Sequence, residues 1–129
     1  PAEALLGADA IVHLSGEPVA QKRWTNEQKR LILETRVLGT RRLVQAVLNH
    51  GPGITSFVHG SAIGFYGDRG EETLTATSAK GAGFLADVVE AWEAELHPLT
   101  ERRPDVRTAM VRTGIVLARQ GGALAIHGA

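Results

Sequence analysis

The stretch that decides the fold is AIVHLSG, residues 10–16. Its first five residues form a short apolar run between Asp9 and the pair Ser15-Gly16, which is typical of a buried strand that ends in a turn. The chain repeats this arrangement twice. A second strand is predicted from about Ser56 to Ser61 in ITSFVHGSA, and a third in VRTAMVRTGIVL, residues 106–117, with a break at Gly114.

Two segments between the predicted strands have apolar residues at helical spacing. The first runs from about Thr25 to Asn49. A threonine at its start, with Gln28 three residues later, indicates a capping box, and Gly51–Gly53 ends it. The second runs from Phe84 to Glu101 and is closed by Pro104.

The predicted order is strand, helix, strand, helix, strand, and each connection is long enough for a crossover helix. Parallel strands are therefore expected, in an α/β, doubly wound, Rossmann-type sheet. The strands are apolar rather than alternating, which favours helices on both faces of the sheet.

Composition narrows the class of protein. The chain has 14 basic and 14 acidic side chains, so neither nucleic acid nor an anionic membrane surface is expected as the main partner. It has no cysteine, which excludes disulfides and thiolate metal sites and fits a cytoplasmic protein. No metal site is expected, and no apolar run approaches the ~20 residues that cross a bilayer.

Ligands of open parallel sheets bind beyond the carboxyl ends of the strands. Here that rule selects the loops that begin at Ser15-Gly16, at Gly60-Ser61 and near Thr113-Gly114. All three contain small residues, which let a ligand approach the backbone closely. We therefore expect one shared ligand cleft.

Four motifs carry a family resemblance: ADAIVHLSGEPVAQKRWTNEQKRLILETRVLGTRRLVQA (8–46), GSAIGFYGDRGEE (60–72), FLADVVEAWE (84–93) and VRTGIVLARQGGAL (111–124). Together they resemble an atypical branch of the extended short-chain dehydrogenase/reductases, whose members are called epimerase-like, NAD(P)-binding or cell-division-inhibitor-like. The resemblance implies that residues 1–129 are the second half of a single NAD(P)-binding Rossmann domain. The GxxGxxG βαβ unit of that domain is not in the sequence, and both ends of the chain are expected to be cuts through a longer protein.

The resemblance implies NADP or NAD as cofactor and an unknown small molecule as substrate. The residues expected to bind the cofactor are Leu14, Ser15, Gly16, Glu17, Arg36, Gly60, Thr113 and Gly114. Arg36 replaces a family asparagine, and its guanidinium suits a phosphate or carboxylate.

The family's proton relay, a Tyr-x-x-x-Lys, falls where this chain has Phe84 and Val88. Neither side chain transfers a proton, so Ser61 and Tyr66 are the predicted catalytic residues. His59 and Lys80 are further candidates, although a core histidine and a solvated lysine are the simpler interpretations.

Three functions remain open. The first is an NAD(P)-dependent oxidoreductase or epimerase-like enzyme with an unusual proton donor. The second is a dinucleotide-binding or redox-sensing protein without catalysis, and the third is an interaction module without ligand. The exposed apolar strand edge that the third implies argues against it. The sequence does not distinguish NAD from NADP or predict an oligomeric state.

Overall fold

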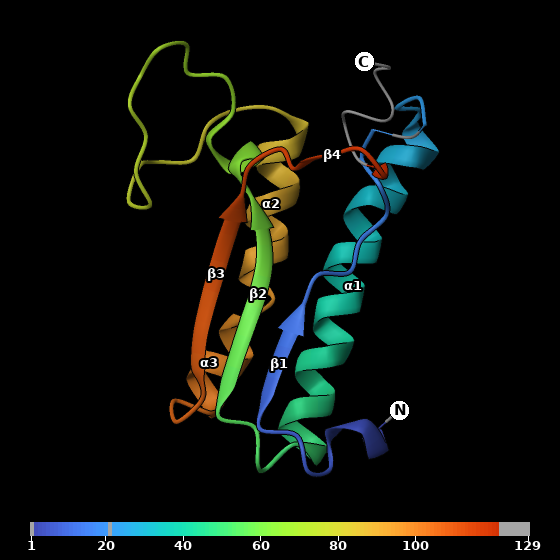
Figure 1. Ribbon diagram of the computed structural model, residues 1–129, viewed down its shortest axis with the longest axis vertical. Helices are drawn as coiled ribbons and strands as arrows, with labels where there is room; N and C mark the ends of the chain where they lie inside the picture. The colour runs from blue at the N-terminus through green and yellow to red at the C-terminus, as the bar shows by residue number, and fades with distance from the viewer. Residues whose placement is uncertain (1, 21, 122–129) are drawn as a thin grey trace.

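The computed structural model describes residues 2–20 and 22–121, so most of the GGALAIHGA end lies outside the described residues. In chain order the elements are η1 (Ala2–Leu5), β1 (Ala10–His13), α1 (Asn26–His50), β2 (Ser56–Ala62), η2 (Ile63–Tyr66), α2 (Phe84–Ala94), α3 (His97–Arg102), β3 (Arg107–Thr113) and β4 (Leu117–Ala118). Figure 1 shows the sheet with its helices behind it.

Strands β1, β2 and β3 form one sheet in that order, and both neighbouring pairs are parallel. Val12 lies opposite Val58, and Val58 lies opposite Ala109. The predicted parallel α/β sheet is therefore confirmed. Strand β3 ends at Thr113, directly before the predicted break at Gly114.

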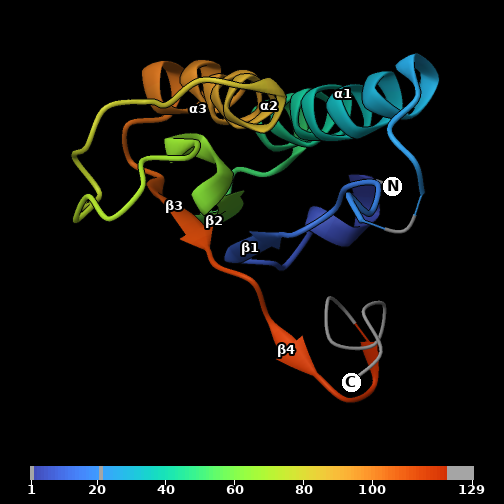
Figure 2. The same ribbon diagram turned by 90° about the horizontal axis from the view of Figure 1, so that it is seen from above.

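Within the described residues the helices lie on one face of the sheet, as Figure 2 shows, so the expectation of helices on both faces is wrong for this part of the chain. The reason is the handedness of the connections. Both crossovers step in the same direction across the sheet, and right-handed crossovers then fall on the same side. The opposite face leaves Val12 64% and Val111 45% exposed.

Helix α1 begins as the capping signal predicts. The Oγ1 of Thr25 accepts a hydrogen bond from the Gln28 backbone N–H at 3.1 Å. The reciprocal half of the box is replaced, because the Gln28 side chain donates instead to Glu17 Oε1 at 3.4 Å. None of the helices in the described part of the chain is both long and apolar enough to cross a membrane.

The predicted helix from Phe84 to Glu101 is two helices, α2 and α3. Pro98 explains the break. Proline has no backbone N–H to bond the carbonyl of Ala94, and its ring clashes with that carbonyl in a continuous helix. Helix α2 ends at Ala94, and Pro98 lies in the first turn of α3, where proline is tolerated.

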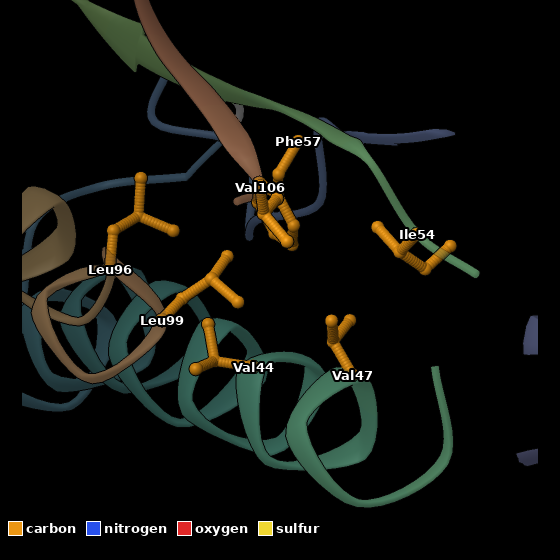
Figure 3. Packing of buried hydrophobic residues seen from close by; sticks show 7 residues of the cluster. All are labelled: Val44, Val47, Ile54, Phe57, Leu96, Leu99 and Val106. Atoms are coloured by element: carbon orange, nitrogen blue, oxygen red, sulfur yellow. The ribbon is translucent and has the colours of Figure 1, made fainter. Parts of the chain in front are cut away.

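The main apolar cluster joins α1, α3 and the residues around the start of β2, as Figure 3 shows. Its buried members are Val44, Val47, Ile54, Phe57, Leu96, Leu99 and Val106. This cluster lies toward the amino ends of the strands, whereas the glycine-containing loops lie at their carboxyl ends. The packed core and the candidate site therefore occupy opposite ends of the sheet.

Candidate functional site

A cavity of about 790 Å³ lies at the carboxyl ends of the strands. Six predicted site residues line it: Leu14, Arg36, Gly60, Ser61, Thr113 and Gly114. The structure thus brings the three predicted loops together at one cavity. Ser15, Gly16, Glu17 and Tyr66 are not among the lining residues.

The glycines at this edge differ in what they do. A Cβ on Gly60 would lie 3.0 Å from the carbonyl oxygen of His13 and 3.1 Å from the Leu14 side chain. Gly60 therefore allows β1 and β2 to pack closely. A Cβ on Gly114 would meet only Ile63, at 3.9 Å, so the backbone of Gly114 is open toward the cavity.

The loop after β1 is tied to helix α1. The backbone N–H of Glu17 donates to Thr35 Oγ1 at 3.0 Å, and Nη1 of Arg36 donates to the Glu17 carbonyl at 2.9 Å. The guanidinium lies so close to Gly16 that a Cβ there would be 2.8 Å from its Cζ. Arg36 thus holds this loop in place, and Gly16 makes room for it.

A hydrogen-bonded chain connects the two predicted catalytic residues. Ser61 Oγ donates to Glu93 Oε1 at 2.6 Å. Arg112 donates from Nε and Nη2 to the Glu93 carboxylate at 2.8 and 2.9 Å, and from Nη1 to the Tyr66 hydroxyl at 3.0 Å. Ser61 and Tyr66 are therefore joined through a mostly buried ion pair.

The hydrogen bonds between Glu93 and Arg112 favour the charged form of both side chains. Burial alone would raise the pKa of the Glu93 carboxyl, but hydrogen bonds from Arg112 and Ser61, together with the charge of Arg112, lower it overall. The hydrogen bond to Glu93 is the largest cause of a raised pKa for Arg112. Glu93 is thus a carboxylate that accepts hydrogen bonds.

Glu93 was missed by the sequence analysis. The signal that marks it is its place on α2: it follows Ala86 by seven residues and Val89 by four, so it continues the buried stripe of the helix. A carboxylate on such a stripe needs a partner inside the protein. That partner, Arg112, comes from β3, which local patterns do not show.

A second polar cluster lies behind the cavity. The Trp92 indole N–H donates to Thr40 Oγ1 at 3.1 Å, and His13 Nε2 shares a hydrogen bond of 3.0 Å with the same oxygen. His59 stacks on His13, with ring centroids 5.5 Å apart.

His59 is fully buried, and neither of its ring nitrogens has a hydrogen-bond partner among the described residues. Burial, followed by the neighbouring His13, lowers the pKa of His59 to about 4, although Glu93 and the Trp92 backbone act in the opposite direction. His59 is a neutral core residue, as the simpler interpretation held, but its polar atoms are unpaired within the described part of the chain.

Phe84 and Val88 stand at the positions of the proton relay that the resemblance implies, and both make packing contacts. Phe84 packs edge-on against Trp24, with ring centroids 5.4 Å apart, and the Lys29 ammonium lies 5.2 Å from the Phe84 ring centre. Val88 is buried and lines the cavity. Lys80 is held by Asp87 at 2.7 Å, outside the cavity lining.

Comparison with known proteins identifies the family. Residues 2–82 match the model of the NAD dependent epimerase/dehydratase family. The chain is similar to an epimerase family protein of Mycobacterium bovis, with 33% identity over 94% of this chain and 39% of that protein.

Two solved structures have the same fold. One is a nucleoside-diphosphate sugar epimerase from Corynebacterium glutamicum, with TM-score 0.82, 38% identity, and coverage of 98% of this chain and 26% of that one. The other is the human epimerase family protein SDR39U1 with NADPH, with TM-score 0.82, 25% identity, and coverage of 98% and 44%. The Rossmann-type fold predicted from the sequence is thereby confirmed.

The chain spans about two fifths of the length of the curated relatives that it matches. The family match nevertheless covers more than half of the chain and includes β1, α1 and β2, which supply Leu14, Arg36 and Ser61 to the cavity. On these grounds the chain belongs to the NAD dependent epimerase/dehydratase family.

Proposed function

We propose that residues 1–129 form the ribose- and nicotinamide-facing half of a single dinucleotide-binding domain, in an oxidoreductase or epimerase-like enzyme that acts on a small molecule. The observation that carries the proposal is the contact between Ser61 and Glu93 at the wall of the cavity. It supplies a polarised hydroxyl beside the region where parallel sheets of this type bind their ligands.

The cavity is compatible with part of a nicotinamide dinucleotide. Its volume of about 790 Å³ lies within the range of small-molecule sites, and Gly114 leaves backbone open toward it. In the proposed arrangement Leu14, Ser15, Gly16 and Glu17 follow the ribose, while Gly60, Thr113 and Gly114 border the nicotinamide. Arg36 contributes by fixing the Glu17 carbonyl. The cofactor, when bound, supplies or accepts a hydride.

Ser61 is the proposed catalytic residue, because its hydroxyl lies at the cavity wall. Its proton is directed at Glu93, so the oxygen lone pairs remain to accept a hydrogen bond from a substrate hydroxyl. Tyr66 reaches Ser61 only through Arg112 and Glu93, which makes it a positioning residue. In the proposed step, Ser61 Oγ takes the proton of the substrate hydroxyl as its own proton passes to the Glu93 carboxylate, and this pair replaces the Tyr-x-x-x-Lys relay.

The test has two stages. Titration of the full-length protein that contains residues 1–129 with NADPH and NADH by calorimetry measures binding, and we expect saturable binding of at least one of them. A panel of small hydroxyl and carbonyl compounds then measures turnover. Ser61→Ala should keep cofactor binding and lower turnover by about 10²- to 10⁴-fold. Ser78→Ala, which removes an exposed loop hydroxyl outside the cavity, is the matched control.

A second candidate, dinucleotide binding or redox sensing without catalysis, is favoured by Phe84 and Val88, which cannot transfer protons. Saturable cofactor binding without turnover across the panel would support this candidate over the enzyme. Absence of binding to either cofactor would reject both candidates.

A further inference from the structure

Arg36 is the one charged side chain among the described residues that line the cavity. The other lining residues are small or apolar except for the hydroxyls of Ser61 and Thr113. Arg36 is half-buried, and a cation in otherwise apolar surroundings loses part of its hydration unless something compensates it. What compensates Arg36 therefore bears on what the cavity holds.

The protein itself compensates this charge only partly. Nη1 of Arg36 donates to two backbone carbonyls, those of Glu17 at 2.9 Å and of Ile32 at 3.1 Å. Its Cζ lies 5.2 Å from the Trp92 ring centre, a weakly favourable contact. No carboxylate in the described part of the chain forms a salt bridge with Arg36, although other arginines there do form such pairs.

The nearest acidic residue has other partners. The Glu17 carboxylate lies 3.8 Å from the Lys22 ammonium and accepts a hydrogen bond from the Gln28 side chain. Burial lowers the pKa of Arg36, and Glu17 opposes that effect only from a distance. Glu17 thus stabilises the cation through space, with no hydrogen bond found between the two side chains in the described part of the chain.

Two donor nitrogens of Arg36 remain available to a ligand. Neither Nε nor Nη2 makes a hydrogen bond to another described residue. These two nitrogens form one edge of the planar guanidinium, and that edge matches the two oxygens of a carboxylate. The guanidinium is positioned by its contacts with Gly16 and Trp92 and by the two carbonyls that accept from Nη1.

We propose that the substrate of this site carries a single carboxylate, bound by Nε and Nη2 of Arg36, on an apolar body that occupies the part of the cavity left open by the nicotinamide. This inference rests on the proposed function, because it names the substrate class of the same site. One cation balances one negative charge, whereas a phosphate dianion would bring an uncompensated charge into an apolar cavity. The lining is apolar apart from Arg36 and two hydroxyls, which suits an apolar body on the carboxylate.

Octanoate, octanamide and octyl phosphate test the assignment, because they share one apolar body and differ in the head group. Calorimetric titrations are run on the full-length protein saturated with whichever of NADPH and NADH it binds. We expect octanoate to bind about 10- to 100-fold more tightly than octanamide, as a charge-assisted hydrogen-bonded pair implies. Octyl phosphate should bind more weakly than octanoate. Equal binding of octanoate and octanamide would overturn the proposal, and tighter binding of octyl phosphate would overturn the choice of carboxylate.

Variants of Arg36 test whether this side chain causes the preference for octanoate over octanamide. Arg36→Met keeps an unbranched apolar stem, and it should bring the octanoate-to-octanamide ratio close to one. Arg36→Lys keeps the charge but loses the planar edge, so its ratio should be intermediate, and it serves if the methionine variant does not fold. Arg41→Met, on the same helix but outside the cavity, should keep the wild-type ratio. A wild-type ratio in Arg36→Met would refute the role of Arg36.

The two proposals fail in different ways. If the wild-type protein binds neither NADPH nor NADH, the proposed function fails, whichever affinities are measured for the octyl compounds. If either cofactor binds and the protein binds octanoate no more tightly than octanamide, the proposed function stands and the carboxylate assignment fails.

Discussion

Replacing Thr40 by valine removes one buried hydroxyl and keeps the shape of the side chain. Thr40 is fully buried, and its oxygen accepts from the Trp92 indole at 3.1 Å and shares a hydrogen bond with His13 at 3.0 Å. Thr40→Val leaves both rings without this partner. A buried polar group that loses its partner costs about 1–3 kcal/mol, so we expect a loss of about 2–4 kcal/mol in the free energy of unfolding.

Urea unfolding at pH 7, followed by tryptophan fluorescence and circular dichroism, measures this loss. With a slope of about 2 kcal/mol per molar urea, the midpoint should fall by about 1–2 M. Thr40→Ser keeps the hydroxyl and removes one buried methyl group, at a cost of about 1 kcal/mol. Thr55→Val, which removes an exposed hydroxyl, is the matched control.

The order of stability among the variants tests whether the hydrogen bonds of Thr40 stabilise the fold. If the hydrogen bonds stabilise this cluster, Thr40→Val is less stable than Thr40→Ser, and Thr55→Val stays close to the wild type. A Thr40→Val protein as stable as the wild type would refute the reasoning, as would a serine variant less stable than the valine variant.

Three further changes test other parts of the structure. In the folded protein the pKa of His59 is about 4, below its ordinary value of 6.5, so the unfolded chain takes up a proton at higher pH than the folded one does. The free energy of unfolding should therefore fall by up to about 3 kcal/mol as the pH drops from about 6.5 to about 4. Urea unfolding at several pH values measures this fall, which should be smaller in His59→Phe. Glu93→Gln leaves Arg112 without its carboxylate and should cost about 2–4 kcal/mol by urea unfolding, against less than about 1 kcal/mol for the exposed pair broken by Glu95→Gln. Gly39→Ala should stabilise α1 by up to about 1 kcal/mol, measured by thermal melting, because a Cβ there meets nothing within 4 Å; a lower melting temperature would contradict this.

Local signals predicted the elements well where one residue type has one dominant effect. Thr25 before a helical apolar pattern predicted a cap, and its oxygen does accept from the backbone of Gln28. Gly114 predicted the end of the third strand, which ends at Thr113. Pro98 is a local signal of the same kind, because it cannot continue a helix, and it divides the predicted single helix into α2 and α3.

The candidate site was predicted in part. The rule that ligands meet parallel strands at their carboxyl ends selected Gly60, Ser61, Thr113 and Gly114, and all four line the cavity. Tyr66 was selected as the only tyrosine of the chain, yet its hydroxyl bonds Arg112 rather than lining the cavity. Its orientation depends on how the loop after β2 packs, which is not a local property.

The sequence alone determined the strand and helix order and therefore the parallel sheet, because apolar periodicity and end signals act within a few residues of the chain. Only the tertiary structure decided which charges meet. The Ser61–Glu93–Arg112 chain joins β2, α2 and β3. Among the described residues, the Glu17 carboxylate contacts Lys22 and Gln28, and Nε and Nη2 of Arg36 have no hydrogen-bond partner. Such pairings depend on distances across the fold, and the mostly buried Glu93–Arg112 pair is favoured because leaving either of its charges without a partner would be costly.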